Sequence, residues 1–202
     1  MAKNGKIGIR MFANESLKSH SIVWKGEISP AYPLYCVVTY RRDNAKFRVL
    51  IDGQTVMVTP DLDQVTSDPH LSKKVADYKN HIETIIRVAD EKERDFSIKG
   101  INQRLYYYSM PVTTCLLETK LKRYLEIVET TGEAKLHSGL LETVFVINQQ
   151  FKSMTVLDWY QGGSSQVRKH LRANTEISPD TIKVLDEILA YDEESTSILG
   201  PL

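Results

Sequence analysis

The stretch from Pro33 to Thr59, PLYCVVTYRRDNAKFRVLIDGQTVMVT, decides the fold of this chain. It holds three runs of alternating β-branched and aromatic residues, separated by the polar segments RDNA and DGQ. Alternation with a period of two, bounded by Asp, Asn and Gly, is typical of half-buried antiparallel strands joined by tight turns. The sequence therefore predicts a three-stranded antiparallel meander in the first half of the chain.

The alternation assigns the side chains of the meander to two faces. One face is apolar, and we expect a helix to cover it. Its residues are Cys36, Val38, Tyr40, Phe47, Val49, Ile51, Val56 and Val58. The opposite face is basic near the RDNA turn and apolar beyond it. Its residues are Tyr35, Val37, Thr39, Arg41, Lys46, Arg48, Leu50, Thr55 and Met57.

The segment before the meander predicts one more strand. Lys6–Phe12, KIGIRMF, alternates apolar and polar residues in the manner of a strand. Asn14–Pro33 is rich in polar residues, Gly and Pro, so we expect a long loop with at most a short strand at Ile22–Trp24. The sheet would then be antiparallel, with three to four strands.

A long amphipathic helix should follow the meander. Asp68-Pro69 is a strong helix start, with Asp as the N-cap and Pro at the first helical position, and apolar residues recur at helical spacing to about Glu93. Ser97 can cap a short second helix over IKGINQRLY. We expect a boundary at Tyr106–Pro111, so that residues 1–110 form a domain of sheet plus helix.

The residues after Pro111 are patterned as helices throughout. Helical spacing and capping signals predict helices over 114–128, 137–154, 156–160 and 165–172, and a final helix after Ser178-Pro179. Residues 111–202 would form a helical second domain with an acidic C-terminal tail. The predicted fold class is therefore α+β: a small antiparallel sheet packed on a long helix, followed by an all-helical domain.

The charge of the chain is zero overall but unevenly distributed. The 202 residues include 26 basic and 26 acidic ones, yet residues 1–50 hold nine Lys/Arg and three Asp/Glu, a balance of +6. Overall neutrality argues against non-specific coating of DNA, so we expect any nucleic-acid contact to be local and early in the chain. No run of about 18 apolar residues and no apolar signal region is present, so neither a spanning helix nor a signal peptide is predicted. The two cysteines, Cys36 and Cys115, do not make a disulfide framework, and we expect reduced thiols in a cytoplasmic protein.

The sequence carries no recognisable catalytic or metal-binding motif. Its five histidines are scattered, and no HExxH, paired CxxC, GxSxG or phosphate-binding lysine loop is present. We therefore predict a protein that is not an enzyme and that needs no metal or cofactor.

Two further segments could carry chemistry, but a structural explanation is simpler for each. Gly162–Ser165, before a predicted helix, could hold a phosphate, although a tight corner between helices explains the same residues. Tyr106–Tyr108 could supply a tyrosine nucleophile, which would need a basic pocket, and only Arg104 lies nearby in sequence. Aromatic packing at a domain junction is the preferred interpretation of the tyrosines.

The segment around Gly162 is also compatible with a helix-turn-helix. The second helix would then be the recognition helix in the major groove. The preceding helix is short and its surroundings are acidic, so a plain helical corner is favoured. The residues that such a recognition helix would present are Gln166, Arg168, Lys169 and Arg172.

The basic end of the meander is the best-supported candidate site. A β-sheet laid in the major groove can use Arg and Lys on bases and on phosphates together. The alternative is a solvated basic hairpin edge, where charge discourages aggregation between strands. The candidate DNA-binding residues are Arg41, Arg42, Lys46, Arg48, Tyr35 and Thr39.

Five segments follow one another between about Lys6 and Arg104: KIGIRMF, PLYCVVTYRRDNAKFRVLI, TVMVTPDLDQV, a helix containing IETIIRVAD, and FSIKGINQRL. In this order they resemble the arm-type DNA-binding domain at the N-terminus of tyrosine-recombinase integrases from phages and conjugative transposons. The resemblance implies a three-stranded sheet packed on a helix, with the exposed face of the sheet entering a DNA groove. It also implies a SAM-like helical domain in the second half.

The catalytic domain of that family has no counterpart in this sequence, and residues 170–172 read HLR rather than the family's HxxR motif. The resemblance therefore implies a non-catalytic, double-stranded-DNA-binding accessory protein of a phage or mobile element. It would act in DNA recombination in a bacterial host cell, with its helical half contacting a protein partner or a second copy. The alternative is a phage virion structural or connector protein that uses the same sheet for protein docking.

Overall fold

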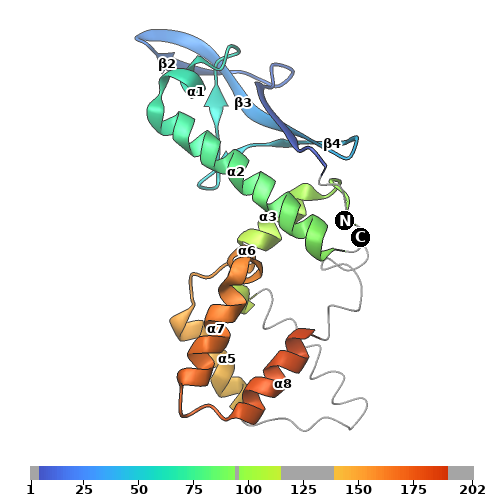
Figure 1. Cartoon of the computed structure of the whole chain (residues 1–202). Helices are drawn as coiled ribbons and strands as arrows, with labels where there is room; N and C mark the ends of the chain where they lie inside the picture. The colour runs from blue at the N-terminus through green and yellow to red at the C-terminus, as the bar shows by residue number, and fades with distance from the viewer. Residues whose placement is uncertain (1–4, 94–95, 115–138, 191–202) are drawn as a thin grey trace. The chain divides into compact units, whose positions relative to one another are not determined.

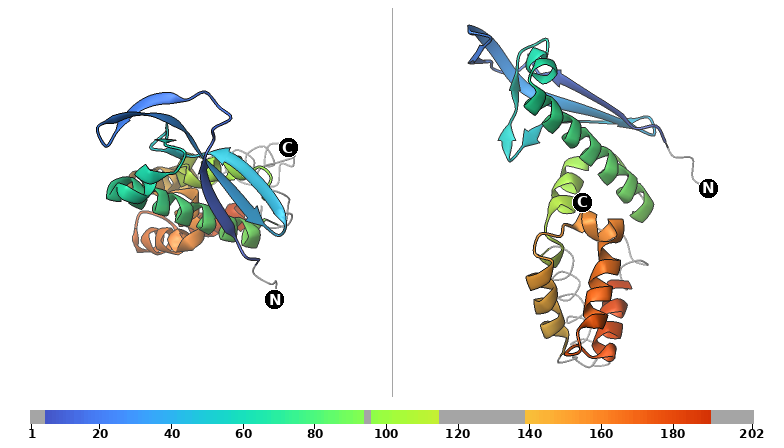
Figure 2. Two further views of the ribbon diagram at one scale, coloured as in Figure 1. Left: turned by 90° about the horizontal axis from the view of Figure 1, so that it is seen from above. Right: turned by 60° about the vertical axis from the view of Figure 1, so that its left-hand side comes forward.

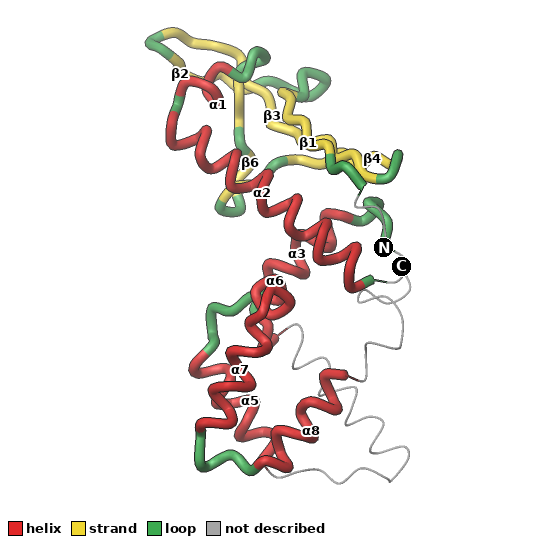
Figure 3. The backbone as a smooth tube through the Cα atoms, in the orientation of Figure 1, coloured by secondary structure: helices red, strands yellow, loops and turns green. Residues whose placement is uncertain are grey.

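The computed structural model describes residues 5–93, 96–114 and 139–190, and its fold class is α+β, as the sequence predicts (Figure 1). The chain divides into two compact units. The first consists of Met1–Arg87 and Phe96–Gln103, and the second of Val88–Asp95 and Arg104–Leu202. All named strands lie in the first unit (Figure 3).

Strand β3, Glu27–Tyr40, organises the sheet of the first unit. It pairs antiparallel with β1 (Gly8–Ala13), β2 (His20–Trp24), β4 (Asp43–Arg48) and β7 (Met57–Val58). Strands β1 and β4 both pair with the second half of β3, so they flank it on opposite sides. The sheet thus has five strands rather than the three to four expected.

The expected long loop over Asn14–Pro33 is wrong, although the short strand suggested at Ile22–Trp24 is present as part of β2. Strand β2 and the first half of β3 form a hairpin there, with Trp24 opposite Glu27 across a two-residue turn at Lys25 and Gly26. Both turn residues have positive φ, which gives the turn the twist that two-residue hairpins need. The polar residues, Gly26 and the two prolines of this segment are typical of loops, and they concealed the hairpin.

The first turn of the meander lies earlier than predicted. Arg41 and Arg42 form it with φ of 50° and 71°, and Tyr40 pairs with Asp43, so most of the RDNA segment belongs to β4. The second predicted turn is confirmed. Asp52 and Gly53 have positive φ and join β5 (Leu50–Ile51) to β6 (Gln54–Thr55) in a separate two-stranded sheet.

The inner face of the sheet is buried largely as predicted, and helix α2 (Pro69–Lys92) runs along it (Figure 2). Asp68 caps this helix, because its carboxylate accepts the backbone N–H groups of His70 and Leu71. The buried residues of the meander include Leu34, Cys36, Val38, Tyr40, Phe47, Val49 and Val58. The buried residues of α2 in this unit are Val75, Ile82, Ile85 and Ile86. Ile51 and Val56, also assigned to this face, are half-buried.

Two short helices flank α2 in the sequence. Helix α1, Asp63–Ser67, was not expected, and Asp63 on it binds the hairpin: it accepts the Trp24 indole N–H at 2.9 Å and pairs with the Lys25 ammonium at 2.6 Å. Helix α3, Ile101–Ser109, begins after Gly100, whose φ is 79°, so it starts later than the predicted IKGINQRLY helix.

The described residues of the second unit form the helices expected from the sequence. These are α5 (Gly139–Gln150), α6 (Val156–Asp158), η2 (Trp159–Gly163), α7 (Ser164–Ala173) and α8 (Pro179–Ala190). The helix predicted over 114–128 and the acidic tail lie almost wholly outside the described residues. No helix in the described part of the chain is long and apolar enough to cross a membrane.

Candidate nucleic-acid interface

Nine residues of β1, β3 and β4 form an outward-facing surface, which we call the basic sheet face. They lie in three cross-strand rows, each with one residue from each strand, because β1 and β4 pair with the same half of β3. The rows are Gly8–Thr39–Asn44, Arg10–Val37–Lys46 and Phe12–Tyr35–Arg48. None of the nine residues is buried.

All the charged residues of this face are positive. Arg10, Lys46 and Arg48 are exposed, and none of the nine residues carries a carboxylate. Among the described residues, no Asp or Glu forms an ion pair with any of these three cations. The face therefore keeps its positive charge available for an anionic ligand.

Aromatic rings lie against two of the three cations of this face, Lys46 and Arg48. The Lys46 ammonium lies 4.8 Å from the centre of the Phe12 ring and 5.3 Å from that of Tyr35. The Arg48 guanidinium lies 5.9 Å from the Tyr35 ring, and the two rings are 6.1 Å apart. Such cation–π contacts are worth about 0.5–1 kcal/mol at exposed sites, enough to favour side chains lying across the face.

Two more arginines stand at the turn that ends the basic sheet face. Arg41 and Arg42 are exposed, and the Arg41 guanidinium lies 5.1 Å from the Tyr40 ring. Both have left-handed backbone conformations, which cost a residue other than glycine about 1–2 kcal/mol. Asn-Gly is the usual choice for such a turn, so this pair adds charge at the expense of stability.

The structure gathers the sequence-predicted site residues into one region. Lys46, Arg48, Tyr35 and Thr39 share the basic sheet face, and the two turn arginines stand at its end. The apolar part of the predicted face is separate from it. Leu50 belongs to β5. Met57 belongs to β7 and pairs with Pro33 on β3. Of the apolar residues predicted for this face, only Val37 therefore lies among the cations.

Four residues of the face were not predicted from the sequence: Gly8, Arg10, Phe12 and Asn44. The alternation in KIGIRMF does place Arg10 on the polar side of its strand. It could not reveal which strand would be the neighbour of β1. Asn44 was assigned to the turn, and the observed turn is two residues earlier.

The Gly162–Ser165 segment forms a kinked helical corner, with φ of 113° at Gly162. A Cβ on Gly163 would lie 2.7 Å from the backbone oxygen of Asp158, so close packing of the corner requires glycine there. The Asp158 carboxylate accepts the Thr155 N–H and hydroxyl, and its negative charge disfavours a phosphate beside it. Packing of the corner thus explains the glycine without a phosphate ligand.

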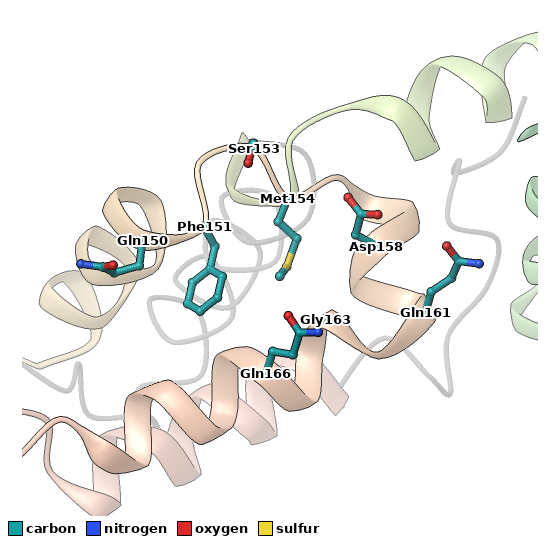
Figure 4. Close-up of a pocket in the computed structure, with 8 residues that line it drawn as sticks. All are labelled: Gln150, Phe151, Ser153, Met154, Asp158, Gln161, Gly163 and Gln166. Carbon is teal, nitrogen blue, oxygen red and sulfur yellow. The ribbon is translucent and has the colours of Figure 1, made fainter. Parts of the chain in front are cut away.

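An open cavity of about 470 Å³ lies beside this corner (Figure 4). Phe151, Met154 and Gln166 converge in it, whereas Gln150 and Gln161 point away from them. None of the side chains that line it is a cation. Its chemistry therefore does not favour a nucleic acid.

The tyrosines of α3 pack rather than form a reactive site. Tyr108 is fully buried, and burial raises the pKa of its hydroxyl, which makes it a poorer nucleophile at neutral pH. Arg104, the nearby cation, is held by the buried Glu93 carboxylate, to which its Nε donates at 2.9 and 3.0 Å. Tyr106 is 68% exposed on the same helix. The burial of Tyr108 agrees with the packing interpretation, whereas the exposure of Tyr106 does not.

The helix-turn-helix alternative is weakened, because Arg168 of its recognition helix is already paired within the unit. The Arg168 Nε donates to the Asp186 carboxylate on α8 at 2.6 Å, so this side chain is committed within the unit. Val167 and Leu171 on the same helix are buried, while Lys169 and Arg172 are exposed. Two exposed cations on a short helix make a weaker site than the basic sheet face.

Comparison of the chain with protein-family models, with curated proteins and with solved structures found no match. Within residues 5–93, 96–114 and 139–190, no three His, Cys, Asp or Glu side chains are grouped so that they could hold a metal ion. Function must therefore be inferred from the charge, exposure and register of the basic sheet face.

Proposed function

We propose that this chain is a non-catalytic protein that binds double-stranded DNA through the basic sheet face. The observation that carries the proposal is the placement of Arg10, Lys46 and Arg48 in two adjacent rows of one exposed surface without a carboxylate. Phosphate contacts from such cations supply most of the affinity of DNA-binding proteins.

The width of the face suits the major groove. Neighbouring strands lie about 4.8 Å apart, so the backbones of β1, β3 and β4 span roughly 10 Å. The major groove of B-DNA is about 12 Å wide and admits elements of this size. The long side chains of Arg10 and Arg48, on the two outer strands, could then reach the phosphates that line the groove.

The resemblance to integrase arm-type domains points to the same use of the sheet. It favours an accessory protein of a phage or mobile element that acts in DNA recombination in the bacterial host cytoplasm. The helical second unit would then contact a protein partner or a second copy of the chain. Neither a metal nor a cofactor is part of this function.

Binding of the whole protein to duplex DNA as a function of salt concentration tests the proposal. Affinity should fall as salt rises, with a logarithmic slope of about −0.9 for each phosphate contacted. Arg10→Ala, Lys46→Ala and Arg48→Ala should each reduce the steepness by about 1. Lys73→Ala, which removes an exposed lysine from α2, should leave the slope unchanged. Failure to bind a mixed pool of duplexes at low salt would refute the proposal.

A second candidate function is protein docking, as in a virion structural or connector protein. The observation that favours it is an exposed apolar pair on the β2–β3 hairpin: Val23 and Ile28 are cross-strand partners and are 75% and 79% exposed. If a second copy covers them, light scattering should detect an oligomer that Val23→Thr and Ile28→Thr dissociate. A monomer that binds DNA tightly would count against this candidate.

A further inference from the structure

The row Gly8–Thr39–Asn44 differs from the two other rows of the basic sheet face, because it carries no charge and no aromatic ring. The Thr39 hydroxyl donates to the Asn44 Oδ1 at 2.6 Å, and both side chains are exposed. This hydrogen bond crosses from β3 to β4 within the row. It restrains the plane of the Asn44 amide, with Oδ1 facing Thr39.

A fixed asparagine amide is a specific reader of adenine. In the major groove adenine presents the N7 acceptor beside the N6 amino donor, and asparagine pairs with both at once. Oδ1 of Asn44 has a second lone pair for the adenine N6–H, and Nδ2 can donate to N7. Guanine presents two acceptors, N7 and O6, so O6 would face Oδ1 without a hydrogen.

The third residue of the row leaves room for a base. Gly8 faces outward beside Thr39, and it is not among the residues with positive φ. A Cβ built there would lie 3.6 Å from the Thr39 Cβ, an ordinary van der Waals contact. The fold therefore tolerates a side chain at this position, and its absence opens the space next to Thr39 and Asn44.

We propose that the Gly8–Thr39–Asn44 row is the base-reading part of the face and that Asn44 recognises an adenine in the major groove. This inference rests on the proposed DNA-binding function. In this proposal the two parts of the face have different roles. Contacts of Arg10, Lys46 and Arg48 with phosphates position the protein on the duplex, and contacts of the uncharged row with a base specify the sequence.

Selection of preferred duplexes from a random pool, followed by affinity measurements, tests the inference with the whole protein. The wild type should enrich a site with a required adenine. Asn44→Ala should lose discrimination at that base pair alone, by roughly 5- to 150-fold, and Thr39→Val should weaken it. Asn80→Ala, on the exposed surface of α2, is the matched control and should keep the preference.

Two substitutions make the outcome specific to the row. Replacing the required adenine with 7-deazaadenine removes N7, so it should weaken the wild type and leave Asn44→Ala unaffected. Gly8→Ala should fold at least as stably as the wild type but bind the selected site more weakly, because the methyl group narrows the approach of the base.

Different results would refute the adenine-reading role of Asn44 and the DNA-binding function on which it rests. Salt-dependent binding with the same sequence preference in the wild type and in Asn44→Ala would overturn the adenine-reading role while leaving DNA binding intact. Absence of binding to any duplex at low salt would overturn the DNA-binding function itself, and the role of Asn44 with it.

Discussion

The Lys46 ammonium on β4 lies 4.8 Å from the centre of the Phe12 ring on β1, although β3 runs between the two strands. The lysine side chain therefore spans the central strand instead of extending into solvent. This contact joins the two outer strands of the basic sheet face, and it places the positive charge over the middle of the surface.

Phe12→Leu should test whether the ring contact that positions Lys46 contributes to DNA binding, because it removes the ring and leaves the lysine charge unchanged. The substitution keeps apolar volume but removes a cation–π contact worth about 0.5–1 kcal/mol, so DNA affinity should fall about two- to fivefold. The salt dependence of binding should stay as in the wild type, because the number of phosphate contacts is unchanged. A slope reduced as much as in Lys46→Ala would show that the ring is needed for the phosphate contact itself.

Arg42→Gly should stabilise the fold and weaken DNA binding. Glycine adopts the φ of 71° without the cost that arginine bears, so the free energy of unfolding should rise by about 1 kcal/mol in urea denaturation. The lost charge should make the salt dependence of DNA binding less steep. Arg42→Lys keeps both the charge and the backbone cost, and should match the wild type in both measurements. Unchanged DNA binding in Arg42→Gly would remove this residue from the interface.

Acid should release the β2–β3 hairpin from α1. Hydrogen bonds from Lys25, then from Trp24 and Ser67, lower the pKa of Asp63 to about 2. An unfolded aspartate has a pKa of about 3.9, so the carboxylate's stabilising effect is complete above pH 4 and is lost as pH falls towards 2. Trp24 fluorescence, recorded with Trp159 replaced by Phe, should change across this range.

Asp63→Asn is the control for that titration, because its side chain cannot ionise. Its Trp24 fluorescence should not change between pH 4 and pH 2 in the same background. A change of equal size in both proteins would assign the transition to another group.

Glu93→Gln should destabilise the second unit strongly. Glu93 and Arg104 are both buried and bound to each other, so neutralising Glu93 removes a buried carboxylate that compensates the Arg104 charge, at a cost of about 3–5 kcal/mol. Glu83→Gln is the matched control on the same helix. Its ion pair with Arg87 is about half exposed, so its loss should cost at most about 0.5 kcal/mol in urea denaturation. Equal effects of the two substitutions would contradict this view of the buried pair.

The sequence by itself determined which side chains of the meander are buried. Successive residues of a strand point to opposite sides, so the alternation assigned Cys36, Val38, Phe47 and Val49 to the core before any pairing was known. It also determined the start of α2, because the Asp68-Pro69 cap is a local signal.

Only the tertiary structure decided the register of the meander. Moving the two-residue turn from Arg41–Arg42 to Asp43–Asn44 would keep every side chain on the same face, because the shift is by an even number of residues. Alternation cannot distinguish the two registers. The observed register places Lys46 opposite Val37.

The sequence alone likewise could not predict which residues make up the candidate site. Strand β1 contributes Arg10 and Phe12 to the face through contacts with β3, more than twenty residues further along the chain. Local patterns fix the face to which a side chain points, whereas only long-range pairing brings strands side by side. The cations were therefore predictable one strand at a time, and their assembly into one surface was decided by the fold.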